Sequence, residues 1–145
     1  MKDVITPRSI TMTIESRLSN VSLLGLAIRG ICESMNGVNS FEMELCVVES
    51  VNNVIKHAYN LETGHSVEVT AFFHADHLAF QVCDQGETVC LNRTSSLDVD
   101  PSRIDTLPEG GMGLFIIRSL MDETHYESTD KGNTFTMIKY FTGPQ

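Results

Sequence analysis

An acid and an amide stand one helical turn apart in the stretch 47–59. Glu49, Asn53, Lys56 and His57 follow helical spacing on one face, and valines with an isoleucine fill a neighbouring face, so the stretch predicts an amphipathic helix. A surface helix would normally carry Lys and Glu on such a stripe, whereas this one would place a carboxylate and an amide against a ligand. The alternative is a solvated helix edge with an accidental Asn-Asn pair.

Two further polar features follow along the chain. Asp84-x-Gly86 ends an alternating stretch, and the glycine cluster 110–113 precedes a short apolar one. Taken alone, the first is typical of an ordinary turn and the second of a backbone requirement. Between them, 87–109 has no periodicity, is rich in Asp, Ser and Thr, and is too long for an idle connection, which predicts a lid or binding segment.

The elements that must position these residues follow from hydrophobic periodicity. Helices are predicted at 21–36, 40–59 and 114–121, and strands at 10–15, 66–74, 78–84, 125–128 and 134–141. Ser19-Asn20 is the predicted N-cap of the first helix. This order indicates an α+β fold with a predominantly antiparallel sheet covered on one face by helices. The 145 residues fit one domain, 1–145.

Composition and charge exclude several classes of protein. No apolar run approaches the roughly 18 residues of a membrane helix, and 1–10 lacks the pattern of a secretion signal, so we expect a cytoplasmic protein without a membrane partner. A net charge of −9 with dispersed basic residues argues against direct nucleic-acid binding. The four scattered cysteines are expected to be reduced core residues. His74 and His77 flank a predicted hairpin turn, which favours a solvated loop over a metal site.

The polar features together resemble a known set of motifs. E-x-x-x-N-x-x-x-H at 49–57, D-x-G at 84–86 and G-G-M-G-L at 110–114 are similar to the N, G1 and G2 boxes of the GHKL ATPases. Within that superfamily, the short chain and its N-terminal strand and helix resemble the bacterial anti-sigma-factor serine kinases. The resemblance covers nearly the whole chain and implies the Bergerat fold, a two-layer sandwich with a mixed, mostly antiparallel sheet. It also implies ATP and Mg²⁺ as cofactors.

The resemblance implies a role for each residue of the N and G1 boxes. The Asn53 amide oxygen would bind Mg²⁺, and Glu49 would act as general base near the γ-phosphate. Asp84 would accept the exocyclic N–H of adenine, which excludes the guanine carbonyl. Gly86 would let the chain pass close to the base. His57 would approach the nucleotide, although a packed histidine is an equal alternative.

The remaining site residues come from the G2 box and the last strand. Backbone N–H groups of Gly111, Met112, Gly113 and Leu114 would bind phosphate at a helix N-terminus. Thr134 resembles the late threonine of the family, which helps to hold the adenine-site carboxylate; the alternative is a strand hydroxyl without a ligand. Two details depart from the family pattern, because Glu87-Thr88 follows Gly86 and Asn133 splits the late Gly-Thr pair.

The function implied is an ATP-dependent serine/threonine protein kinase. It would phosphorylate an anti-anti-sigma antagonist and sequester a sigma factor by partner switching, and 10–35 is apolar enough to support a homodimer. One alternative is an ATP-binding anti-sigma or adaptor module without kinase activity, which Glu49 disfavours because binding alone needs no base. Another is the detached ATP-binding part of a histidine kinase, which the lack of a phospho-acceptor helix pair ahead of the domain disfavours.

Overall fold

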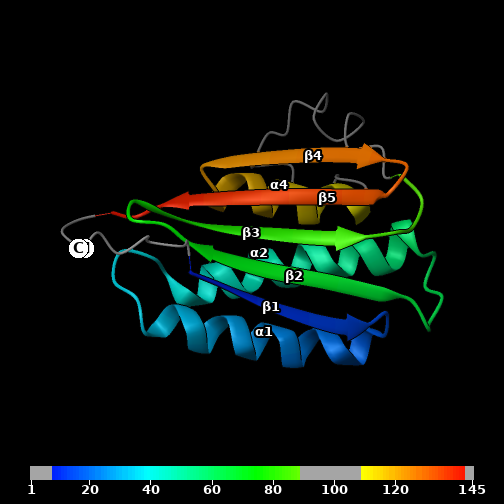
Figure 1. Ribbon diagram of the computed structural model, residues 1–145, viewed down its shortest axis with the longest axis horizontal. Coiled ribbons are helices and arrows are strands. Elements are labelled where there is room, and N and C mark those ends of the chain that lie inside the picture. The colour runs from blue at the N-terminus through cyan, green and yellow to red at the C-terminus, as the bar shows by residue number, and fades with distance from the viewer. Residues whose placement is uncertain (1–7, 89–108, 143–145) are drawn as a thin grey trace, which may run out of the picture.

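A single antiparallel sheet carries helices on one of its faces (Figure 1). The computed structural model describes residues 8–88 and 109–142. The strand order is β1-β2-β3-β5-β4, and all four pairings are antiparallel, so the α+β class and the helical layer are confirmed. The elements are β1 Arg8–Glu15, α1 Leu18–Glu33, α2 Ser40–Asn53, the π-helix η1 Val54–Ala58, β2 Ser66–Phe73, β3 His77–Asp84, α4 Glu109–Leu120, β4 Glu123–Thr129 and β5 Gly132–Tyr140.

The hydrophobic core lies between the sheet and the helices. Alternate residues of β2 face inward, so Val67 and Val69 are fully buried, and Ile28 of α1 is buried against the same layer. Cys32 and Cys46 belong to this core as predicted, and burial raises their pKa to about 11 and about 12. Both thiols are therefore protonated and unreactive at neutral pH. The prediction of a core position is wrong for Cys83, which is only partly buried, and Cys90 lies outside the described residues.

The first helix begins earlier than predicted. α1 starts at Leu18 with Arg17 as its N-cap residue, and the Arg17 side chain makes no capping hydrogen bond. The prediction of a Ser19-Asn20 cap is wrong because Asn20 already lies in the first turn, where its Nδ2 donates to the carbonyl of Glu15. The second helix begins at Ser40 as predicted, and the Asn39 side chain accepts from the N–H of Glu42 at 3.0 Å.

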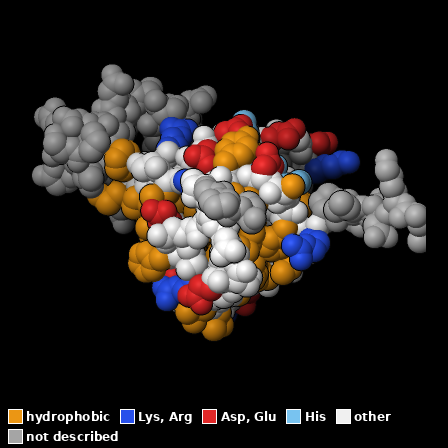
Figure 2. Space-filling view, turned by 90° about the vertical axis from the view of Figure 1, so that its left-hand side faces the viewer, with side chains coloured by type: hydrophobic (Ala, Val, Ile, Leu, Met, Phe, Trp, Pro, Cys, Tyr) orange, Lys and Arg blue, Asp and Glu red, His pale blue; other side chains and the backbone are white. Residues whose placement is uncertain are grey.

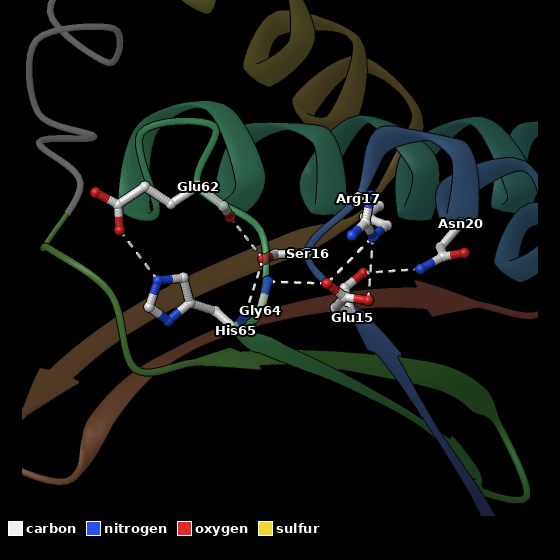
Figure 3. Close-up of polar contacts among 7 residues, drawn as sticks. All are labelled: Glu15, Ser16, Arg17, Asn20, Glu62, Gly64 and His65. Carbon is white, nitrogen blue, oxygen red and sulfur yellow. Dashed lines mark hydrogen bonds and ion pairs between the residues drawn. The ribbon is translucent and has the colours of Figure 1, made fainter.

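The turn after η1 is hydrogen-bonded to the end of β1 and the residue that follows it (Figure 3). Ser16 is buried, its Oγ donates to the carbonyl of Glu62, and it accepts from the N–H of His65. The carboxylate of Glu15 accepts from the N–H of Gly64 at 2.9 Å. These bonds fix the segment between the π-helix and β2, which must be held still if the polar end of α2 is to be positioned.

The opposite end of the sheet carries the β2–β3 turn and a mixture of hydrophobic and charged side chains (Figure 2). The predicted turn is confirmed, since the N–H of His74 donates to the carbonyl of His77 across it. The two imidazole rings stack with centroids 4.2 Å apart. Over residues 8–88 and 109–142, no group of three or more His, Cys, Asp or Glu side chains is arranged to hold a metal ion.

Candidate functional site

The candidate site forms where the ends of α2 and β3 meet the start of α4, at one end of the sheet (Figure 1). Glu49 and Asn53 lie one turn apart on α2, and both are partly buried. On the other side of the helix, Val47 and Val51 are fully buried in the core. Core packing therefore fixes the rotation of α2 that presents the acid and the amide.

The glycine cluster comes against these two side chains. A Cβ added to Gly113 would lie 2.8 Å from Glu49 Oε2 and 3.5 Å from Asn53 Oδ1, so only glycine leaves the carboxylate where it is. Within the described part of the chain, the side chains of Glu49 and Asn53 have no hydrogen-bond partner. The structure thus brings together the acid, the amide and the glycine cluster and leaves the two polar groups available to a ligand.

The start of α4 differs from the prediction. The helix begins at Glu109, five residues before the predicted 114. The N–H groups of the N-cap and of the first three helical residues have no partner within a helix, so Gly111, the third residue of α4, keeps an amide that can meet an anion. In a helix with this start, the amides of Met112, Gly113 and Leu114 are placed to donate within the helical i→i−4 ladder. Contact of these amides with a phosphate stays a prediction, whereas the close approach of Gly113 to Glu49 is a feature of the structure.

The helix α2 passes into a π-helical turn directly after Asn53. The N–H of Tyr59 donates to the carbonyl of Val54, five residues back, at 3.0 Å. This wider turn buries Ala58 and leaves Lys56 and His57 exposed. His57 is not among the residues that line the cavity described below. Its contact with a nucleotide therefore stays a prediction.

Asp84 and Gly86 form a tight turn that packs on the π-helix. Asp84 is the last residue of β3, is 7% exposed, and accepts from the N–H of Gly86 at 2.9 Å. A Cβ on Gly86 would lie 2.4 Å from the carbonyl oxygen of Ala58, which shows why glycine is needed there. That same carbonyl accepts from the N–H of Glu87. The turn is therefore locked onto the helix by backbone contacts.

The hydroxyl of Tyr59 holds the middle of this turn. It donates to the carbonyl of Ser66 at 2.7 Å and accepts from the N–H of Gln85 at 2.9 Å. Burial raises the pKa of Tyr59, so the phenol keeps the proton that it donates. The ring also stacks on His65, with centroids 4.5 Å apart.

Asn133, which the sequence analysis missed, takes the place predicted for Thr134. The β3–β5 register pairs Asp84 with Asn133 and Cys83 with Thr134, and successive strand residues face opposite sides of the sheet. Asn133 is 3% exposed, and its Nδ2 donates to Asp84 Oδ1 at 2.8 Å. Thr134 lies on the outer face, with its Oγ1 3.7 Å from the Cys83 sulfur. The prediction that Thr134 holds Asp84 is therefore wrong.

The alternation of inward-facing residues along β5 indicates that Asn133 faces the core. Met137 is fully buried, and counting back in twos places Phe135 and Asn133 on the same inner face. A buried amide at the end of such a strand needs a polar partner, and Asp84 is the residue opposite. The motif resemblance favoured the threonine because it matched a residue type without fixing the strand's phase.

A small cavity joins the polar features of the site. Its volume is about 30 Å³, and it lies between α2, β3, α4 and the last two strands. That volume suffices for water, so a purine could enter only if lining side chains move. The lining residues are Ser50, Asn53, Val54, Asp84, Leu114, Tyr126 and Phe135. Members of all three motifs thus lie around one space.

Comparison with known proteins identifies the family of the domain. The pattern of the histidine kinase-like ATPase domain matches residues 14–139, which include every residue of the site. The chain belongs to the histidine kinase-like ATPase domain family. This ATPase domain is one that binds ATP, and the cavity between α2 and β3 is where its motif residues converge.

Curated relatives of the ATPase domain are serine-protein kinases. The Serine-protein kinase RsbW of Staphylococcus epidermidis is 37% identical over 145 residues, which cover 94% of this chain and 89% of the relative. The Serine-protein kinase RsbW of Bacillus velezensis is 31% identical over 140 residues, covering 92% and 86%. The solved RsbU and RsbW domains of Rv1364c from Mycobacterium tuberculosis superpose with a TM-score of 0.66 at 15% identity. That match covers 94% of this chain and 33% of the longer one, and it shows the shared fold.

Proposed function

We propose that this ATPase domain is an ATP-dependent serine/threonine protein kinase that uses Mg²⁺. The observation that carries the proposal is the close approach of Gly113 to Glu49 and Asn53, together with the cavity that Asn53 lines with Asp84. The names of the relatives, which are serine-protein kinases over nearly the same length, support the same reaction.

At the phosphate end, the donors fit a hard cation and a phosphate chain. Asn53 offers a neutral amide oxygen, and Mg²⁺ typically takes one or two protein ligands with water and phosphate oxygens. When bound, the ion would neutralise charge on the phosphates. The unpartnered first-turn amide of Gly111 would hold a phosphate oxygen. Each of these groups is positioned by an element already described.

Glu49 would act on the acceptor hydroxyl. The hydroxyl oxygen forms a bond to the γ-phosphorus, the bond from that phosphorus to the β–γ bridging oxygen breaks, and ADP leaves. The proton of the hydroxyl passes to the Glu49 carboxylate, which has no described partner to compete for it. A protein substrate therefore has to present its serine or threonine over the α2–α4 contact.

At the base end, Asp84 would select adenine. Its carboxylate accepts hydrogen bonds, so it suits the exocyclic amine of adenine and disfavours the carbonyl of guanine. Gly86 lets the turn lie against the Ala58 carbonyl of the π-helix, and it would let the chain pass close to the base. ATP selection thus rests on one buried acid.

We further propose that the substrate is an anti-anti-sigma antagonist and that the domain alternately holds a sigma factor. The proposal rests on the relatives and on exposed hydrophobic side chains of β1 and α1, where a protein partner or a second copy of the chain would pack. These side chains are Ile10, Leu18, Leu23 and Leu26. No helix in the described part of the chain has the length and apolar character needed to cross a membrane. The proposed compartment is the cytoplasm.

A second candidate is an ATP-binding anti-sigma or adaptor module without kinase activity. Glu49, which lies against Gly113, is a feature that a module would have no reason to keep. The two functions therefore differ in a single testable residue.

Glu49→Gln separates them. The full chain is incubated with γ-labelled ATP, Mg²⁺ and each candidate antagonist, and transfer and nucleotide binding are measured separately. For a kinase, transfer falls roughly 10²–10⁴-fold, the contribution expected of a general base, while ATP binding persists. The matched control is Glu68→Gln, which makes the same change at an exposed position on β2 and should leave transfer intact. ATP binding by the unaltered chain without transfer to any antagonist would favour the module.

A further inference from the structure

The amide of Asn133 joins both ends of the Asp84–Gly86 turn. Its Nδ2 donates to Asp84 Oδ1 at 2.8 Å and to the carbonyl of Gly86 at 3.0 Å, and the carbonyl of Glu87 lies 3.4 Å away. A threonine hydroxyl has one hydrogen and could serve only one of the two nearer acceptors. Asn133 therefore does something at this position that a threonine could not.

The surroundings fix which way the amide points. If its oxygen and nitrogen were exchanged, the oxygen would face two backbone carbonyls, which offer no hydrogen. On the other side, Ser128 Oγ donates to Asn133 Oδ1 at 2.7 Å. Because the single hydroxyl hydrogen of Ser128 is used there, Thr88 must donate in the 2.8 Å contact between the two hydroxyls. The donors thus run in one direction, from Thr88 through Ser128 and Asn133 to Asp84.

This direction determines what Asp84 can offer to a base. Asp84 Oδ1 receives two groups that can only donate, the Asn133 amide and the N–H of Gly86. Asp84 needs no proton of its own to satisfy them. Its second oxygen has no hydrogen bond within the described residues, and Asp84 lines the cavity beside Asn53. One oxygen is therefore used to hold the carboxylate, and the other remains as an acceptor.

We propose that Asn133 is a positioning residue that determines base specificity, because it keeps Asp84 as a pure acceptor aimed at the cavity. The proposal rests on the proposed function, in which that cavity takes the base of ATP. The ligand class is an adenine nucleotide, whose exocyclic amine donates, and the class rejected is a guanine nucleotide, whose carbonyl accepts at the same place. Asn133 acts through Asp84 and need not touch the nucleotide.

The decisive variant is Asn133→Asp. A second carboxyl at the position of the amide cannot stay ionised together with Asp84, so the pair shares one proton at neutral pH. Asp84 can then donate as well as accept. We expect the ratio of ATP to GTP affinity, measured by calorimetric titration of the full chain with Mg²⁺, to fall at least tenfold. A merely structural role would weaken both nucleotides alike and leave the ratio unchanged.

Two further variants complete the test. Asn20→Asp makes the same charge change on α1, away from the cavity, and should keep the ratio of the unaltered chain. Ser128→Ala removes only the hydroxyl that orients the Asn133 amide, and we expect a two- to fivefold fall in the ratio, which decides the matter if Asn133→Asp does not fold. An unchanged ratio in the variants that fold would overturn the inference alone. Failure of the unaltered chain to bind either nucleotide would overturn the proposed function and the inference with it.

Discussion

The base end and the phosphate end of the site are built in different ways. Around Asp84, the carboxylate, the Gly86 turn and the buried Asn133 amide are already joined by hydrogen bonds between 2.8 and 3.0 Å. Around Glu49 and Asn53, the described residues provide no such bonds, and the defining contact is the close approach of Gly113. The polar groups of the base end are therefore hydrogen-bonded before a ligand binds, whereas Glu49 and Asn53 at the phosphate end have no such bonds to the described residues.

The difference has a physical basis in what each end must do. A base is recognised by one fixed acceptor, and a fixed acceptor costs little to reorganise on binding. A cation with phosphates brings its own charge and its own ligands, so the protein groups there must remain open to it. Buried polar groups without partners reduce stability, which limits how many such groups the phosphate end can carry.

Gly113→Ala tests whether the phosphate end depends on position. The added methyl would displace the Glu49 carboxylate, which lies 2.8 Å away, but it meets only the flexible end of a side chain. We expect phosphoryl transfer to fall about a hundredfold, as for a displacement of about 1 Å at a reacting group. The free energy of unfolding should change little. The higher helix propensity of alanine contributes about 1 kcal/mol, which offsets the cost of displacing the Glu49 side chain.

Gly30→Ala is the matched control for that variant. Gly30 lies in α1, and a Cβ there meets nothing within 4 Å, so we expect the helical gain of about 1 kcal/mol with transfer unaffected. Transfer rates and urea unfolding curves of both variants give the comparison. If Gly113→Ala transfers phosphate at the normal rate, the close contact with Glu49 has no catalytic meaning.

Gly86→Ala tests the base end, where the neighbouring atoms cannot move aside. The added methyl would lie 2.4 Å from the Ala58 carbonyl oxygen, and that carbonyl is already bonded to the N–H of Glu87. We expect the free energy of unfolding to fall by about 1–3 kcal/mol, the range for overpacking, with a matching loss of ATP affinity. Urea denaturation measures the first and calorimetry the second. If the free energy of unfolding of Gly86→Ala equals that of Gly113→Ala, the two ends of the site accommodate an added methyl group equally well.

The sequence predicted the two ends unequally well. Helical spacing placed Glu49 and Asn53 on one face, and the structure confirms that they share it, because the valines behind them leave one rotation for α2. The partner of Asp84 was not predictable from a motif, since it depends on the register Asp84 with Asn133 across β3 and β5. A one-residue difference in phase exchanges Thr134 for Asn133 and moves the side chain to the other face.

The boundaries of the helices show the same limit. The start of the second helix has a local signal, an acidic side chain in the first turn, and its prediction at Ser40 is confirmed. The start of α4 was predicted at 114 because the glycines of the cluster have low helix propensity, yet the structure continues the helix back to Glu109. Within this helix, Gly113 lies close to Glu49 of α2. Such a tertiary contact is not encoded in any local sequence pattern.

Tyr59→Phe is the mildest test of whether the hydrogen bonds of the base end are formed before the nucleotide binds. The lost hydroxyl joins the carbonyl of Ser66 to the N–H of Gln85, and both residues are exposed enough for water to replace it. We expect the free energy of unfolding to fall by about 1 kcal/mol and ATP affinity to fall a few-fold. The ATP-to-GTP ratio should not change, because Asn133 and Asp84 keep their bond. The control is Tyr140→Phe, which removes the hydroxyl of an exposed tyrosine bonded to Glu123. It should change neither the ATP affinity nor the ATP-to-GTP ratio. If Tyr59→Phe alters the ratio as strongly as Asn133→Asp, specificity belongs to the turn as a whole and not to the amide that holds its carboxylate.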